Sequence, residues 1–338
     1  MKKARVLVVD DSAFARTVLA KLMRANADID VIGSARDGAD ALEKIAAMDP
    51  DVVTLDLTMP EIDGIGVLRA LQGQARPRVI VVSMSSVDTE LGAEALALGA
   101  IDLIAKPTSL ASDRLNEIGD ELIAKVLAAT SGYTVGPSEP AAGANLARPV
   151  GEVELVMVGT STGGPQALTR LLTALPGNLR APLAMVLHIP VGYTEALAAR
   201  LDHLSALHVV EASEGLRLVP GMAVLARAGE HLTIVREKEA LVARLATRPN
   251  GLFMPSVDEL FKSGATAVGA KALGVVLTGM GDDGLIGSRQ LAGSGAGLLT
   301  EAASSCVVYG MPRAVYEAGL GATSVPLERM AEEIARRV

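Results

Sequence analysis

A glycine-flanked serine is the first candidate for chemistry in this chain. The mostly apolar segment 153–158 runs into Gly159-Thr160-Ser161-Thr162-Gly163, which has the pattern Gly-x-Ser-x-Gly. Small residues on both sides of Ser161 allow a sharp turn after a strand, and a helix beginning just beyond would point backbone N–H groups at an oxyanion. This geometry suits a serine nucleophile. An ordinary strand-to-helix turn or a phosphate-binding loop would show the same five-residue pattern, so other residues must discriminate.

A serine nucleophile needs a general base, and the chain has four histidines. His188 follows the apolar run 183–187, at the end of the next predicted strand after that of Ser161. The end of a neighbouring strand would face the serine turn, so we expect His188 to be the base. The other three occupy polar or turn-like contexts that fit the surface: His203, His208 and His231.

The base needs a carboxylate that orients it. The predicted strand 274–277 runs into Thr278-Gly279-Met280-Gly281-Asp282-Asp283-Gly284, where small residues again allow the backbone to approach closely. We expect one of the two aspartates to accept a hydrogen bond from His188 Nδ1–H. A cap for the helix after Gly284 is the structural alternative, and both roles are compatible. The chain order Ser, His, Asp differs from that of α/β-hydrolases, so that fold is not expected.

A second set of polar residues follows strands predicted in the first third of the chain. Asp10 and Asp11 follow the first strand, Asp56 ends the third, Ser83 follows the fourth and Lys106 follows the fifth. Parallel strands bring all five to one edge of the sheet, whereas a helix cap explains each aspartate only by itself. Three carboxylates repel unless a cation lies among them, and an oxygen-only set favours Mg²⁺. Asp56 would then accept a phosphoryl group, which Lys106 and Ser83 would contact.

Two α/β units must position these residues. Over 1–122, apolar strands alternate with amphipathic helices, which predicts a parallel, doubly wound, five-stranded sheet. The segment 153–338 predicts a second α/β domain with a mainly parallel sheet, in which further strands are expected at 183–187, 223–226, 232–235, 274–277 and 297–299. Gly, Pro and Ser accumulate after residue 129. We therefore expect a first domain at 1–123, a helix tail and linker at 124–152, and a second domain at 153–338.

Composition excludes several classes of protein. The chain carries 31 basic and 39 acidic residues, a net charge of −8, no Trp, 3 Phe and 4 Tyr, so nucleic acid is not an expected partner. The single cysteine, Cys306, excludes an intrachain disulfide framework, and we expect a buried structural thiol. Neither a signal-peptide core nor an apolar run of about 18 residues is present, so we expect a cytoplasmic protein without membrane insertion.

Residues 4–122 resemble response-regulator receiver domains. The resemblance rests on Val8-Val9-Asp10-Asp11-Ser12, on Leu55-Asp56-Leu57-Thr58-Met59-Pro60-Glu61-Ile62-Asp63-Gly64 and on Lys106-Pro107. It implies that Asp10 and Asp11 hold Mg²⁺ together with Asp56, and that a chemotaxis histidine kinase phosphorylates Asp56. Leu103 stands where many receivers carry an aromatic residue that reports phosphorylation, which affects the expected switch route rather than the chemistry.

Residues 153–335 resemble the chemotaxis protein-glutamate methylesterase domain. The resemblance rests on Gly159-Thr160-Ser161-Thr162-Gly163-Gly164-Pro165, His188-Ile189-Pro190, Pro255-Ser256-Val257-Asp258-Glu259-Leu260-Phe261, Leu277-Thr278-Gly279-Met280-Gly281-Asp282-Asp283-Gly284 and Val308-Tyr309-Gly310-Met311-Pro312. Joined to a receiver, the chain resembles the chemotaxis response-regulator methylesterases. This implies hydrolysis of glutamate methyl esters on methylated chemoreceptors, with release of methanol, and deamidation of receptor glutamines.

The same resemblance assigns roles in the second domain. Ser161 is the nucleophile, His188 the base and Asp283 the orienting acid; Thr162 neighbours the nucleophile, and the Met280 N–H is an oxyanion donor. No cofactor is expected in this domain. The receiver is expected to cover the Ser161 cleft until phosphorylation shifts the population to an open state.

Three departures from the family pattern concern the substrate side of the site. Leu187-His188-Ile189-Pro190 replaces the commoner Gln-His-Met-Pro, Met254 stands where an Arg usually precedes Pro-Ser-Val-Asp, and 298–302 lacks the usual Ala-Gln-Asp-Glu. They keep open a second hypothesis, a phosphorylation-dependent adaptor or phosphate sink with a silent esterase domain. A nucleotide-binding protein is disfavoured, because the Gly163-Gly164 loop lacks the P-loop lysine and the Gly-x-Gly-x-x-Gly spacing.

Overall fold

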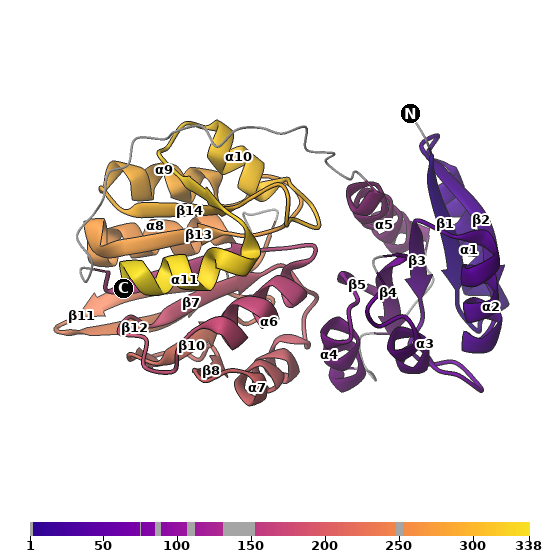
Figure 1. Ribbon diagram of the computed structural model, residues 1–338, viewed down its shortest axis with the longest axis horizontal. Coiled ribbons are helices and arrows are strands. Elements are labelled where there is room, and N and C mark those ends of the chain that lie inside the picture. Colours follow the sequence, from indigo (N-terminus) through magenta and orange to yellow (C-terminus); the bar gives the residue numbers. More distant parts are fainter. Residues whose placement is uncertain (1–2, 75, 85–88, 107–111, 131–152, 248–252) are drawn as a thin grey trace. The chain divides into compact units, whose positions relative to one another are not determined.

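The computed structural model describes residues 3–74, 76–84, 89–106, 112–130, 153–247 and 253–338. The chain divides into two compact units, Met1–Gly132 and Tyr133–Val338 (Figure 1). Of the linker expected at 124–152, residues 124–130 form the end of a helix, and 131–152 lie outside the described residues.

The first unit is a five-stranded parallel sheet with the order β2-β1-β3-β4-β5. This confirms the doubly wound sheet predicted from the alternation of strands and helices. The strands are β1 (Ala4–Val9), β2 (Ile29–Ala35), β3 (Val52–Leu55), β4 (Arg78–Met84) and β5 (Asp102–Lys106). The helices are α1 (Ala13–Arg24), α2 (Gly38–Met48), α3 (Gly64–Ala70), α4 (Thr89–Ala97) and α5 (Ser112–Thr130).

The second unit is built on a seven-stranded parallel sheet with the order β15-β14-β13-β6-β7-β10-β8. Its strands are β6 (Leu155–Thr160), β7 (Leu183–Leu187), β8 (His208–Glu211), β10 (Met222–Leu225), β13 (Ala272–Val276), β14 (Gly297–Glu301) and β15 (Thr323–Val325). Its helical segments are α6 (Gly164–Ala174), α7 (Thr194–Leu204), α8 (Val257–Val268), the 3₁₀ turn η1 (Gly269–Lys271), α9 (Leu285–Gly293), α10 (Met311–Glu317) and α11 (Leu327–Arg337).

A separate three-stranded sheet contains β11 (His231–Glu237), β12 (Ala240–Ala246) and β9 (Arg217–Leu218). The segment 232–235, expected in the mainly parallel sheet, lies instead in β11, which pairs antiparallel with β12. Only Lys238 and Glu239 connect these strands, and so short a connection requires an antiparallel hairpin. His231 begins β11 and is buried, so the expectation that it lies at the surface was wrong.

Both faces of the seven-stranded sheet are covered. Along β6, Val156 and Val158 pack into a core with α6, α7 and α11, while Leu155 and Met157 pack on the opposite side with α8 and the β11–β12 hairpin. Figure 1 shows these helices on the two sides of the sheet. Alternate residues of a strand point to opposite faces, so a sheet buried on both sides has continuously apolar strands.

Two composition-based expectations can be compared with the structure. Within the described part of the chain, none of the helices combines the length and apolarity that a bilayer-spanning helix requires. Cys306 is half-buried rather than fully buried. Burial raises the pKa of the Cys306 thiol, which keeps it protonated.

Leu168→Ala should lower the free energy of unfolding of the second unit by about 3 kcal/mol, because it opens a cavity in a fully buried part of the core. Leu204→Ala is the matched control in the same unit, where the side chain is 47% exposed and the expected loss is below about 1 kcal/mol. Urea unfolding followed by circular dichroism measures both. Equal losses would contradict the assignment of Leu168 to the core.

Candidate functional sites

Ser161 lies in the turn between β6, which ends at Thr160, and α6, which begins at Gly164. The Ser161 N–H donates to Thr278 O at 3.1 Å, and the Gly164 N–H donates to Ser161 O at 2.7 Å. Gly163 has a φ of 82°, and a Cβ there would lie 2.6 Å from Val307 Cβ. Both constraints require glycine, which explains the small residues around the serine. Ser161 therefore stands at the carboxyl edge of the sheet, immediately before a helix N-terminus.

The neighbouring strands bring two further segments to Ser161. Thr160 pairs with Leu187 on β7, and the His188 N–H donates to Thr160 O at 3.2 Å, so Ser161 and His188 follow adjacent positions. On the other side β13 pairs with β6, and the Leu277 N–H donates to Gly159 O at 2.9 Å. The central position of β6 places the serine turn between the ends of β7 and β13.

His188 pairs with Asp283 through its Nε2, which lies 2.8 Å from Asp283 Oδ2. The expectation that Nδ1 would make this contact was wrong. His188 Nδ1 is buried and has no hydrogen-bond partner among the described residues. One face of the imidazole stacks on Phe253, with ring centroids 4.3 Å apart and planes 4° apart. Asp283 holds the ring through Nε2 and Phe253 holds it through one face, which leaves Nδ1 for proton transfer.

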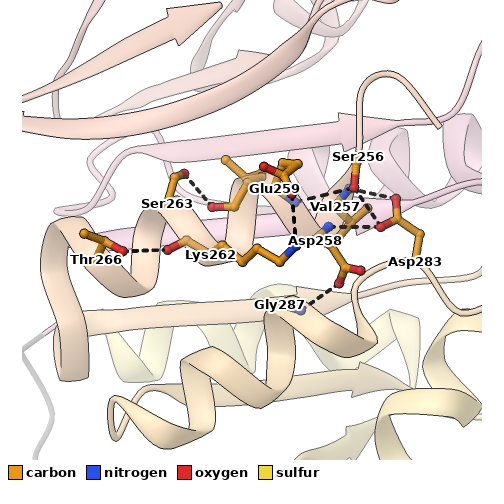
Figure 2. Close-up of polar contacts among 10 residues, drawn as sticks. Ser256, Val257, Asp258, Glu259, Lys262, Ser263, Thr266, Asp283 and Gly287 are labelled. Atoms are coloured by element: carbon orange, nitrogen blue, oxygen red, sulfur yellow. Dashed lines mark hydrogen bonds and ion pairs between the residues drawn. The ribbon is translucent and has the colours of Figure 1, made fainter. Parts of the chain in front are cut away.

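Asp283 is buried and accepts several hydrogen bonds, most of which Figure 2 shows. The backbone N–H groups of Val257 and Asp258 donate at 2.8 and 3.0 Å, and Ser256 Oγ donates at 3.0 Å. Asp283 therefore caps α8 and not α9, the helix after Gly284 that the sequence suggested. Burial by itself raises the pKa of Asp283, but His188 and the two backbone donors outweigh it and lower that pKa. The carboxylate stays ionised beside the imidazole.

Thr162 and Met280 complete the predicted set around Ser161. Thr162 is almost fully buried, and its carbonyl accepts a hydrogen bond from Thr278 Oγ1 at 2.9 Å. Gly279 O accepts from the N–H groups of Gly310 and Met311 at 3.1 and 2.9 Å, which fixes the turn. The Met280 N–H has no acceptor among the described residues, so it remains available to a developing oxyanion.

The structure brings the predicted residues of the first unit together. Asp10, Asp11 and Asp56 each offer an oxygen within 4.8 Å of the others. Lys106 Nζ lies 2.7 Å from Asp10 Oδ2 and 2.5 Å from Asp56 Oδ2. Ser83, fully buried on β4, pairs in register with Ala105, the residue before Lys106. Pro107, the other half of the Lys-Pro pair, lies outside the described residues.

The charges of this cluster are unbalanced. Burial raises the pKa of Asp56, and the charge of Asp10 adds to that rise, although Lys106 opposes it. Burial lowers the pKa of Lys106, but the two carboxylates outweigh it and raise that pKa. Asp56 Oδ1 is buried and has no hydrogen-bond partner among the described residues. One ammonium among three carboxylates leaves negative charge and free oxygen ligands, a donor set that fits Mg²⁺.

The fold and the two sites define a receiver domain joined to an α/β domain with a serine–histidine–aspartate set. Residues 6–117 match the family model of the response regulator receiver domain, and residues 156–334 match that of the CheB methylesterase. The chain belongs to the CheB methylesterase family.

Full-length relatives and a solved structure are similar to this chain. It is 54% identical, over 99% of its length and 98% of the relative's, to protein-glutamate methylesterase/protein-glutamine glutaminase 5 of Myxococcus xanthus. It is 42% identical to the protein-glutamate methylesterase/protein-glutamine glutaminase of Symbiobacterium thermophilum, over 99% of its own length and 97% of the relative's. The chain is also similar to the crystal structure of the Thermotoga maritima CheB methylesterase catalytic domain, with 34% sequence identity and a TM-score of 0.54. This match covers 55% of the present chain and 99% of the crystallised chain.

Asp283→Asn should destabilise the second unit by about 2 kcal/mol at neutral pH, because it removes a buried, multiply hydrogen-bonded acceptor. The folded-state pKa of Asp283 is lowered, so its contribution is present above the unfolded value of 3.8 and is lost as the pH falls through the folded value. The difference in unfolding free energy between wild type and Asp283→Asn should therefore become smaller below pH 3.8, as measured by denaturant unfolding.

Asp282→Asn is the control for this prediction, since Asp282 is the exposed neighbour of the buried Asp283. It should leave the unfolding free energy nearly unchanged at either pH. An equal effect of the two substitutions would mean that the hydrogen bonds of Asp283 do not stabilise the fold.

Proposed function

We propose that this protein is a phosphorylation-activated protein-glutamate methylesterase that also deamidates protein glutamines, and that its substrates are methylated chemoreceptors. The observation that carries the proposal is the His188–Asp283 pair at the strand end beside Ser161. The names of the full-length relatives support the same pair of activities.

In this mechanism Ser161 Oγ attacks the γ-carbonyl carbon of a methylated glutamate. His188 Nδ1 takes the serine proton, because Nε2 is committed to Asp283, and then donates that proton to the departing methanol oxygen. Water attacks the acyl-enzyme while His188 accepts one of its protons, and His188 then donates that proton to Ser161 Oγ as the acyl bond breaks. The other water proton leaves on the glutamic acid product, which ionises in solvent to the carboxylate. With a glutamine substrate the acyl-enzyme is the same and ammonia is the first product.

The surrounding groups would stabilise the charges that develop. Ionised Asp283 favours the imidazolium form of His188 during each transfer. The Met280 N–H and the N-terminus of α6 supply donors for the oxyanion, and Thr162 holds the chain beside the nucleophile.

In the first unit we propose that Asp10, Asp11 and Asp56 hold Mg²⁺ and that a chemotaxis histidine kinase phosphorylates Asp56. The bound ion would neutralise charge on the transferred phosphoryl group. Lys106, now paired with both Asp10 and Asp56, would contact that group, as would Ser83. We assign the receiver to 1–123, the linker to 124–152 and the esterase to 153–338, and propose that the unphosphorylated receiver covers the Ser161 cleft.

The adaptor hypothesis is not favoured. The relatives are named for the two hydrolytic activities, His188 pairs with Asp283, and Ser161 follows the strand position next to that of His188. One of the three departures that supported that hypothesis is segment 298–302, and it includes buried residues of β14.

Ser161→Ala should reduce methanol release from methylated chemoreceptor membranes by about a thousandfold or more while the chain stays folded, because the nucleophile is removed. Ser304→Ala, an exposed serine of the same unit, is the matched control and should release methanol at the wild-type rate. Activity retained by Ser161→Ala would remove Ser161 from the mechanism.

A small phosphodonor with Mg²⁺ should raise the rate of methanol release by the full-length protein, and Asp56→Asn should abolish that increase. The exposed Asp30→Asn is the control and should keep it. An increase that survives in Asp56→Asn would place the phosphoacceptor elsewhere, and release that ignores the donor in the wild type would remove the switch.

A further inference from the structure

Glu301 is a carboxyl residue with no exposed surface at the end of β14. Its contacts are neutral: the Thr278 N–H lies 2.8 Å from Oε2, and Ser305 Oγ lies 3.0 Å from Oε1. No ion pair joins Glu301 to a cationic side chain within the described ranges. A carboxylate in such surroundings is costly unless it is paired or protonated.

Thr278 connects this carboxyl to the serine turn. While its N–H donates to Glu301, its carbonyl accepts from the Ser161 N–H at 3.1 Å and from Thr160 Oγ1 at 2.7 Å. Its hydroxyl donates to Thr162 O at 2.9 Å and accepts from the Val308 N–H at 2.9 Å. A shift of Thr278 would therefore move Ser161, Thr162 and the loop that leads to Met280.

The contacts of Ser305 are compatible with a protonated Glu301. Ser305 Oγ lies 3.0 Å from Glu301 Oε1, 3.2 Å from Ala302 O and 3.0 Å from the Leu327 N. Ala302 O also accepts from the Ser305 and Cys306 N–H groups at 3.1 and 3.3 Å. The single hydroxyl proton of Ser305 can therefore be donated to either Glu301 or Ala302. When Glu301 is protonated, it donates to Ser305 Oγ, which still accepts from the Leu327 N–H.

We propose that Glu301 is a positioning residue of the esterase site that acts as a neutral carboxylic acid, holding Thr278 and through it the Ser161 turn and the Met280 loop. The role rests on the proposed esterase function. Ionisation of Glu301 would place a buried negative charge next to the loop that stabilises the oxyanion, and the rate would fall.

The surroundings favour the protonated form of Glu301. Burial raises the pKa of Glu301, and the negative charge of Glu328 raises it further, while the Thr278 N–H and Ser305 oppose the rise. β13 and β15, on either side of β14, carry no titratable side chain. The titratable groups on the other adjoining segments are the Cys306 thiol, Arg289 on α9, Arg313, Tyr316 and Glu317 on α10, and Glu328, Arg329, Glu332, Glu333, Arg336 and Arg337 on α11. Arg170 of α6 lies 3.7 Å from Glu328.

The test compares kcat and KM for methanol release across pH in full-length wild type, Glu301→Gln and Glu301→Leu. The amide of Glu301→Gln reproduces the neutral acid, so kcat should stay within about threefold of wild type at neutral pH. In wild type, kcat should fall at alkaline pH as Glu301 ionises, and this alkaline fall in kcat should disappear in Glu301→Gln. Glu301→Leu removes the acceptor for Thr278, and kcat should fall about tenfold or more with KM changed less than about twofold. Glu328→Gln removes a negative charge that raises the pKa of Glu301, so the alkaline fall in kcat should move to lower pH.

Infrared spectroscopy gives a readout that does not depend on esterase activity. The carbonyl stretch of a buried protonated carboxylic acid should be present in wild type at neutral pH and lost in Glu301→Gln. If wild type releases no methanol, the proposed function fails while this band still tests the protonation of Glu301. An absent band, an alkaline fall that persists in Glu301→Gln, or an unchanged kcat in Glu301→Leu would overturn the inference.

Discussion

The parallel register of β13, β6 and β7 determines the rest of the second unit. Adjacent strands lie about 4.8 Å apart, so residues that end neighbouring strands at the same level must meet. The register puts Ser161 beside His188 on one side and beside Thr278 on the other. Close approach also explains a glycine: a Cβ at Gly279 would lie 2.9 Å from Ser161 Cβ.

Two buried carboxyls of this unit have opposite pKa shifts for a common reason. Asp283 accepts hydrogen bonds from His188, from Ser256 and from two N–H groups at the start of α8, and these outweigh burial. Glu301 has only neutral donors among the described residues, namely the Thr278 N–H, Ser305 and the Cys306 thiol, and burial prevails. The number and charge of the donors decide which acid stays ionised. Asp283, beside the base, is ionised, and the proposed state of Glu301, next to the loop that leads to Met280, is neutral. This arrangement suits acyl transfer through an anionic intermediate.

The sequence predicted the parts of both sites that depend on where strands end. Apolar runs followed by Asp10, Asp56, Ser161 and His188 are local patterns, and parallel topology converts them into neighbours. The choice of Nε2 over Nδ1 for the Asp283 contact could not be predicted, because it depends on the rotation of one ring.

Other misses have similar causes. Phe253 stacks on His188 from a segment without periodic pattern, and the only signal was its place just before Pro-Ser-Val-Asp in a chain with three phenylalanines. From the sequence, the segment containing Glu301 is recognisable only as a departure from the family pattern, since nothing local shows that a glutamate ending a strand is buried. The same cause applies to His231, because the hairpin that buries it is a long-range arrangement.

In the first unit, Leu103 is fully buried within β5, where it pairs in register with Val81 of β4. A phosphoryl group on Asp56 would compete with Asp10 and Asp56 for Lys106, so the change in charge would act first on the ends of β4 and β5. With an aliphatic side chain already buried at position 103, an aromatic ring at this position would not take part in the response to that change.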